Sequence, residues 1–197
     1  QIEFWKERAA WDNDRFEKLL DKQFPTGRRT RAYFWNDKIY NHPIQPVVGV
    51  CWYEVRAYLT WLSAQTDLSF RLPTEVEWEA AACGLSSKRY PFGEDFEPKC
   101  CNTFEAHLRR TSPVGVFPDG DTSEKVADLS GNISEWTSSF CRPYPYDSAD
   151  GRERCDGIGN RVLRGGSWFD SHDFARVAFR FDLPSVHFDG GRGFRLC

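Results

Sequence analysis

Residues 128–136 read DLSGNISEW and residues 161–168 read RVLRGGSW, and these two stretches decide the fold. Each combines a short apolar run with glycine and serine, which is typical of brief strands that end in turns. Residues 161–163 are expected to form a strand, and so are residues 175–181 and 193–196. The second half of the chain is therefore expected to consist of short strands joined by long loops.

Helices are expected in the first half of the chain. In residues 53–65, apolar side chains recur at spacings of three and four on one helical face. Thr74 and Glu77 form a capping-box pattern ahead of an alanine run that stops at Gly84. A further helix over residues 3–20 has four inward positions: Trp5, Phe16, Leu19 and Leu20. The sequence thus predicts an α+β fold with short strands, a few helices and much irregular loop.

Composition limits the class of protein. The chain has 197 residues, 40% of them hydrophobic, which suits a single domain over residues 1–197. The net charge is −3 and basic residues are scattered, so we expect no nucleic-acid partner. No stretch approaches the roughly 20 apolar residues that span a bilayer, so no membrane span is expected. The seven cysteines are expected to be mostly reduced thiols.

The chain contains no methionine, so we expect it to be a piece of a longer protein. A targeting segment or a fused N-terminal domain would then be missing. The sequence as given favours a cytoplasmic location, with surface display as the alternative if a targeting segment is missing. A regulatory or assembly module attached to such an N-terminal domain is one further hypothesis for its function.

Seven segments, in order, resemble the formylglycine-generating-enzyme and sulfatase-modifying-factor family. They are NHP at 41–43 with VVGVCW at 47–52, RLPTEVEWE at 71–79, YPFG at 90–93, PVG at 113–115, DLSGNISEW at 128–136, RVLRGGSW at 161–168 and GFR at 193–195. The fold of that family is a C-type-lectin-like domain, so the resemblance implies this architecture. Residues 1–40 precede it as an expected N-terminal helical extension, and residues 161–197 form the C-terminal segment.

The resemblance also bears on catalysis. The oxidase of this family binds copper through two cysteines that follow its Gly-Gly-Ser motif. Aligned on residues 165–167, those positions are Asp170 and Ala175 here, and neither supplies the thiolate that Cu(I) requires. The resemblance therefore implies a protein that is not an enzyme and holds no copper. A copper-dependent formylglycine-generating or related thiol oxidase is the alternative.

Residues 169–192 read FDSHDFARVAFRFDLPSVHFDGGR and contain no Lys, Glu, Gln, Trp or Met. Every residue type in this segment can be reached from the asparagine codon AAC by changing its two adenines. In this respect the segment resembles the variable region of proteins diversified by retroelements, in which template adenines are randomised. The alternative is a loop that drifted in a degenerate family member.

The segment suits ligand binding, because phenylalanine offers apolar area at low rotamer cost and Asp and His offer directional polar contacts. We expect variable ligands, with proteins favoured over sugars because the apolar patch is broad. The predicted contact residues are Phe169, Asp170, Ser171, His172, Asp173, Phe174, Val177, Phe179, Phe181, Asp182, Leu183, Ser185, His187, Phe188 and Asp189. The residues expected to form a supporting strand are Ala175, Arg176, Ala178 and Arg180.

The resemblance implies a structural calcium ion as well. Its ligands would be side-chain or main-chain oxygens of Asp128, Gly131, Ile133 and Glu135, the oxygen set that a hard cation prefers. The alternative is a structural turn in which Glu135 accepts backbone N–H groups.

Overall fold

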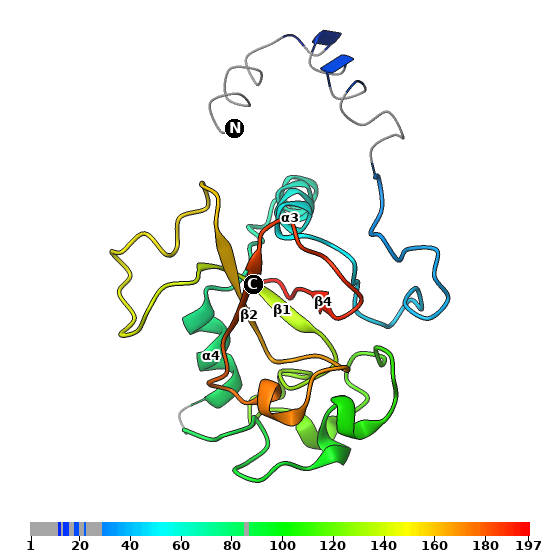
Figure 1. Cartoon of the computed structure of the whole chain (residues 1–197), viewed down its shortest axis with the longest axis vertical. Helices are drawn as coiled ribbons and strands as arrows, with labels where there is room; N and C mark the ends of the chain where they lie inside the picture. The colour runs from blue at the N-terminus through cyan, green and yellow to red at the C-terminus, as the bar shows by residue number, and fades with distance from the viewer. Residues whose placement is uncertain (1–11, 13, 16–17, 20–21, 23–28, 85–86) are drawn as a thin grey trace. The chain divides into compact units, whose positions relative to one another are not determined.

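A computed structural model describes residues 12, 14–15, 18–19, 22, 29–84 and 87–197 (Figure 1). The chain divides into two compact units, Gln1–Arg31 and Ala32–Cys197, and the fold described below is that of the second. Most of the helix expected over residues 3–20 lies outside the described residues. In the described part of the chain, no helix combines the length and apolar character that crossing a bilayer requires.

Two α-helices form where the sequence predicts them. Helix α3 spans Trp52–Thr66, and helix α4 spans Glu75–Cys83. At the start of α4 the Thr74 side chain accepts a hydrogen bond from the backbone N–H of Glu77, and the Glu77 side chain accepts one from the Thr74 N–H. This reciprocal capping satisfies two N–H groups that have no partner within the helix.

Four strands make one sheet in the order β3-β2-β1-β4. Strands β1 and β2 pair antiparallel, as do β2 and β3, whereas β4 lies parallel to β1. The strands are β1 (Ser134–Phe140), β2 (Asn160–Arg164), β3 (Phe181–Pro184) and β4 (Arg192–Gly193). Short 3-10 helices interrupt the loops at η1 (Pro98–Cys100), η2 (Phe104–Ala106), η3 (Pro118–Gly120) and η4 (His172–Ala175). The α+β prediction with short strands and much loop is confirmed.

Helix α3 covers one face of the sheet. Trp136 and Leu163 are register partners across β1 and β2, so their side chains share a face. Both are fully buried in a core with Trp52, Val55 and Leu59 of α3. The Trp52 indole N–H donates to the Thr137 carbonyl at 2.9 Å, which ties the helix to β1.

Helix α4 covers the opposite face, and Figure 1 shows the two helices on different sides of the sheet. Glu135 and Arg164, the next register pair, point to this face because side chains alternate along a strand. The Trp78 indole N–H of α4 donates to Glu135 at 2.6 Å, and Arg164 forms an ion pair with Glu79 of the same helix. The C-terminal strands are thus held between two helices.

Two expected strands differ from the structure. The strand expected at residues 175–181 is wrong, because residues 172–175 form η4 and β3 begins only at Phe181. In this segment, hydrogen bonds to distant loops take the place of hydrogen bonds between strands. The Val177 N–H donates to the Arg89 carbonyl, and the Ala175 carbonyl accepts from the Ser130 hydroxyl. The strand expected at 193–196 is reduced to Arg192–Gly193.

Candidate functional site

The surface built by residues 169–192 depends on a tight turn after β2. Gly166 has a φ of +68°, a conformation that residues with a Cβ rarely adopt. A Cβ placed on Gly166 would lie 2.9 Å from the carbonyl carbon of Phe174. Glycine therefore lets the segment fold back closely on the end of β2.

The phenylalanines of this segment are not sealed in the core. Phe169, Phe174 and Phe181 are 37%, 38% and 38% exposed, and Phe179 and Phe188 are half-buried. The rings of Phe174 and Phe179 pack against each other with centroids 4.7 Å apart. The segment therefore presents apolar side chains that contact one another and also reach solvent.

Two predicted contact residues belong to the framework instead. Val177 is 3% exposed and packs in a core with Trp78, Ala82 and Leu129, which attaches the segment to α4. Ser185 is 4% exposed, and its hydroxyl donates to the Gly159 carbonyl at 2.8 Å. Both need correction, because a buried side chain cannot contact a ligand on the surface.

The expected scaffold residues also divide. Ala175 is fully buried, as expected of a framework position, whereas Ala178 is exposed. Arg180 donates two hydrogen bonds to the buried carboxylate of Glu75, at 2.9 and 2.8 Å. Arg176 is half-buried and ion-paired with Asp173 at 3.6 Å.

Most polar side chains of the surface are held by neighbours within the chain. The Ser167 hydroxyl donates to Asp170 at 2.5 Å, and the Asn160 amide donates to Asp182 at 2.7 Å. His187 Nε2 lies 3.0 Å from Asp189 Oδ2. The remaining predicted contact residues, Ser171 and Leu183, are half-buried. These bonds fix the side chains before any ligand arrives, which lowers the entropic cost of binding.

His172 is fixed from two sides. Its Nδ1 lies 3.0 Å from the Tyr90 hydroxyl, and its ring stacks on Phe96 with centroids 4.6 Å apart. The backbone N–H of His172 donates to Glu105 at 3.1 Å. Burial raises the pKa of Glu105, but hydrogen bonds from Thr103 and His172 outweigh it and place that pKa below its usual value. The carboxylate form therefore anchors the start of η4.

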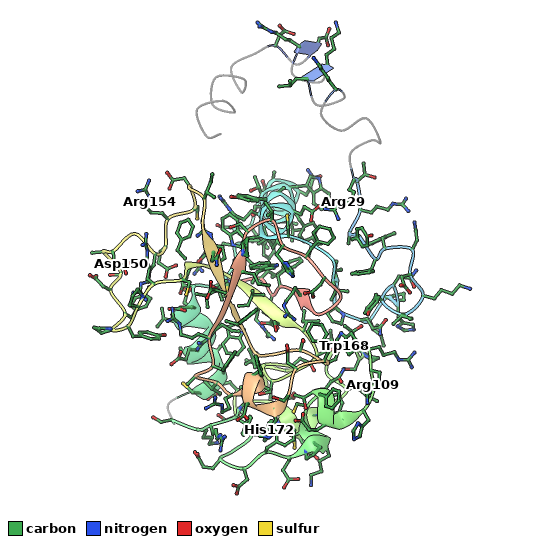
Figure 2. All side chains as sticks on the ribbon, viewed as in Figure 1. Arg29, Arg109, Asp150, Arg154, Trp168 and His172 are labelled. Carbon is green, nitrogen blue, oxygen red and sulfur yellow. The ribbon has the colours of Figure 1, made fainter. Side chains whose placement is uncertain are left out.

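Side chains outside residues 169–192 border this surface, and sequence reasoning missed them. The Phe104 N–H donates to the Asp170 carbonyl at 2.9 Å, and Arg109 stacks over the Phe104 ring at 4.7 Å. On another side, the rings of Tyr33 and Phe188 lie 5.2 Å apart. Figure 2 shows Arg109 on the same part of the molecule as Trp168 and His172. Only tertiary contacts reveal these neighbours, because they are distant in sequence.

The proposed calcium ligands have other partners in the structure. Arg195 donates to both oxygens of Glu135, at 2.6 and 2.7 Å, and also to the carbonyl of Asp128 at 3.4 Å. The Asp128 carboxylate accepts the Gly115 N–H at 2.7 Å, and burial raises its pKa. The main-chain carbonyl of Gly131 accepts the Ile133 N–H at 2.9 Å. Arg195 thus supplies the positive charge that calcium would bring, so these residues do not fit the ion well, and the calcium site stays a prediction.

The two positions aligned with the copper-binding cysteines differ in environment. Asp170 lies at the surface turn and is hydrogen-bonded to Ser167, whereas Ala175 is buried against the framework. Within the described residues, no group of three or more His, Cys, Asp and Glu side chains is placed to hold a metal ion.

The curled four-stranded sheet between two helices, with its looped C-terminal surface, defines a C-type-lectin-like domain of the α+β class. The family model of the sulfatase-modifying factor enzyme 1-like domain matches residues 10–197. The chain belongs to this family, which confirms the resemblance at the family level.

Similar proteins carry different functional names. Hercynine oxygenase of Mycobacterium tuberculosis is 35% identical over 196 residues, covering 93% of this chain and 44% of that protein. The inactive C-alpha-formylglycine-generating enzyme 2 of Bos taurus is 37% identical over 166 residues, covering 76% of this chain and 49% of that protein. The chain spans less than half the length of these relatives.

Solved structures share the fold as well. Treponema denticola variable protein 1 superposes with a TM-score of 0.67 at 24% identity, covering 78% of this chain and 70% of that one. This likeness concerns the fold alone. Proteins named as active and as inactive enzymes therefore share the family, and the family by itself does not decide whether this chain is catalytic.

Proposed function

We propose that this chain is a non-catalytic ligand-binding protein whose contact surface is built by residues 169–192. The observation that carries the proposal is the exposure of Phe169, Phe174 and Phe181 at the place where the family's oxidase carries its thiols. Asp170 and Ala175 replace those thiols, and neither is a soft ligand for copper. The surface offers contacts without the groups that oxidase chemistry needs.

Protein ligands suit this surface best. Interface cores are enriched in aromatic side chains and depleted of charge, and the energy concentrates in a few desolvated anchors. The exposed phenylalanines match the aromatic anchors, and the carboxylates held by Ser167 and Asn160 add directional polar contacts beside them. The prearranged side chains favour a rigid surface that meets a partner with little rearrangement.

Diversification by a retroelement explains how burial relates to residue type. The exposed positions carry side chains of very different chemistry, such as Phe174 and Asp173, whereas Ala175 and Val177, which follow them, are buried and hold the segment in place. A framework of this kind tolerates changes at its exposed positions. Its genetic signature would be a near-copy of the coding segment differing at adenines, beside a reverse transcriptase gene.

Segment exchange tests the proposal. Residues 169–192 are replaced by a segment with new residues at the exposed positions and with Ala175, Val177, Arg180, Ser185 and Arg192 retained. We expect the melting temperature to stay within a few degrees and the set of bound proteins in a fixed panel to change. In a matched control, the same number of substitutions at exposed positions of α3 should leave the bound set unchanged. Loss of folding on most exchanges, or an unchanged bound set, would contradict the proposal.

An oxidase or oxygenase is the second candidate, because relatives at 35% identity carry the name hercynine oxygenase. A direct assay decides between the two functions. The chain is incubated with Cu(I), oxygen and a sulfatase-derived cysteine peptide, and separately with hercynine, oxygen, cysteine and a divalent transition-metal ion. We expect no turnover in either reaction, and multiple turnovers in one of them would replace the binding proposal with an enzymatic one.

A further inference from the structure

A small cavity lies in the surface built by residues 169–192. It measures ≈ 30 Å³ and is walled by Phe174, Phe179 and Phe181, with Asp170 and Arg192 as its charged residues. A water molecule needs about 10–15 Å³ of such space, so the cavity holds about two to three water-sized groups. It is therefore large enough for the end of one compact side chain.

Arg192 lines this cavity and carries an unused donor. Its side chain is 8% exposed, and its Nη1 donates to the Ser167 hydroxyl at 3.3 Å and to the Gly191 carbonyl at 3.4 Å. Its Nε is buried and has no hydrogen-bond partner among the described residues. A buried N–H without an acceptor is costly, so a ligand oxygen at this position would be stabilised.

Asp170 brings the matching acceptor. Its Oδ2 accepts the Ser167 hydroxyl at 2.5 Å and lies 3.7 Å from Arg192 Nη1. In the described part of the chain, its Oδ1 accepts no hydrogen bond. One donor and one acceptor therefore remain available on two residues that line the cavity.

The surrounding charges select a neutral ligand group. Besides Asp170, the Asp189 carboxylate lies 3.8 Å from Arg192 Nε, so two carboxylates offset one guanidinium. Two negative charges against one positive leave a net charge of −1, which disfavours an anion, and an ammonium group has no lone pair with which to accept the Arg192 N–H. The group that fits is neutral, planar and compact, with one acceptor and one donor.

We propose that this cavity binds a primary carboxamide, as carried by an asparagine or glutamine side chain of a protein ligand. The amide oxygen accepts from Arg192 Nε, the amide N–H donates to Asp170, and the flat group packs against the phenylalanine side chains that line the cavity. This inference rests on the proposed ligand-binding function and names the chemistry of one anchor within it.

Nuclear magnetic resonance of the side-chain Nε–H groups of arginine tests the proposal on the intact chain. The probes are propionamide, propionate and propylammonium, which match in size and differ in charge. We expect propionamide to shift the Arg192 Nε–H signal in a saturable way, with the other two probes far weaker. The signal is assigned with Arg192→Lys, which lacks Nε. Arg176→Lys is the matched control, because Arg176 belongs to the same segment and does not line the cavity.

A second variant keeps the test decisive if Arg192→Lys fails to fold. Asp170→Asn preserves the size of the side chain and removes the charge of the acceptor, and we expect propionamide to bind about tenfold more weakly. A stronger response to propionate, or no saturable shift with propionamide up to its solubility limit, overturns the carboxamide subsite. Neither result changes the outcome of the segment exchange, so failure here is distinct from failure of the ligand-binding function.

Discussion

Arg195 and Glu135 form a two-pronged ion pair on the face of β1 that α4 covers: Nε lies 2.6 Å from Oε2, and Nη2 lies 2.7 Å from Oε1. The Glu135 side chain is 5% exposed and also accepts the Trp78 indole N–H. Burial lowers the pKa of Arg195, but the Glu135 carboxylate outweighs it and raises that pKa above its usual value. The C-terminal GFR motif is thereby attached to the SEW motif of β1 and, through Trp78, to α4.

Removal of Arg195 should therefore destabilise the whole domain. Arg195→Ala leaves a nearly buried carboxylate without its cation, and we expect a loss of about 3 kcal/mol or more in the free energy of unfolding. Arg195→Lys keeps the charge without the two-pronged geometry and should lose less. Urea unfolding of both variants measures the difference, and equal losses would show that a positive charge without the two-pronged geometry stabilises nothing.

The same variants test the calcium prediction. Because Arg195 occupies the Glu135 carboxylate, we expect the melting temperature of the unchanged chain to be the same in calcium and in a chelator. Arg195→Ala exposes the oxygens of Asp128 and Glu135, and calcium should raise its melting temperature. A rise in the unchanged chain would instead show that the ion and the arginine coexist.

Glu75 is a second buried charge with a structural role. It is fully buried and contacts Arg180 at 2.8 Å and Arg152 at 3.4 Å, which joins α4 to residues 141–159 and to the proposed contact segment. Glu75→Gln should lower the free energy of unfolding by about 3–5 kcal/mol, because two largely buried guanidinium groups lose their shared anion. A change below about 1 kcal/mol would show that neighbouring groups such as Asp150 suffice for Arg152.

The sequence predicted the elements that local chemistry determines. The capping box at Thr74 and the periodic face of α3 depend on neighbours three and four residues away, so a single sequence carries them. The strand expected at 175–181 was wrong because residues distant in sequence determine the conformation of this segment. The Ser130 hydroxyl and the Arg89 carbonyl form hydrogen bonds with its backbone. Apolar character alone did not separate buried Val177 from exposed Phe174. Arg192 was missed because no sequence pattern distinguishes a buried arginine from an exposed one.

Within residues 169–192, the proposed contact segment, a buried and an exposed side chain are expected to differ in how much they contribute to the free energy of unfolding. Val177→Ala opens a gap against Trp78 and Leu129 and should lower the free energy of unfolding by about 1–3 kcal/mol. Phe181→Ala removes a ring that is 38% exposed and should lower it by only about 1 kcal/mol. Thermal unfolding compares the two variants. A larger loss for Phe181→Ala would show that the phenylalanines support the core and do not form an interchangeable surface.

Glu77 predicts a pH dependence at acid pH. A bidentate hydrogen bond from Arg71 lowers the pKa of Glu77 to about 2. A carboxyl group with a lowered pKa stabilises the fold above its unfolded pKa, and this contribution is lost as the pH falls from about 4.5 towards 2. Both side chains are about half exposed, so the expected loss is below about 1 kcal/mol. Glu77→Gln should flatten stability in this pH window alone, and an unchanged slope would contradict the assignment.

Gly166 makes the strictest prediction, because two costs add at one position. The backbone at this position is left-handed, with a φ of +68°, which disfavours any residue that has a Cβ. A Cβ placed there would also lie 2.9 Å from the carbonyl carbon of Phe174. Gly115 has a similar φ of +73°, but a Cβ placed on it meets nothing within 4 Å. Gly115→Ala should therefore cost about 1–2 kcal/mol from backbone strain alone, and Gly166→Ala about 1–3 kcal/mol more from the clash, because packed backbone cannot yield. Urea unfolding of both variants isolates the steric contribution. Equal losses would mean that the Phe174 backbone moves aside and that the turn does not hold the contact segment rigid.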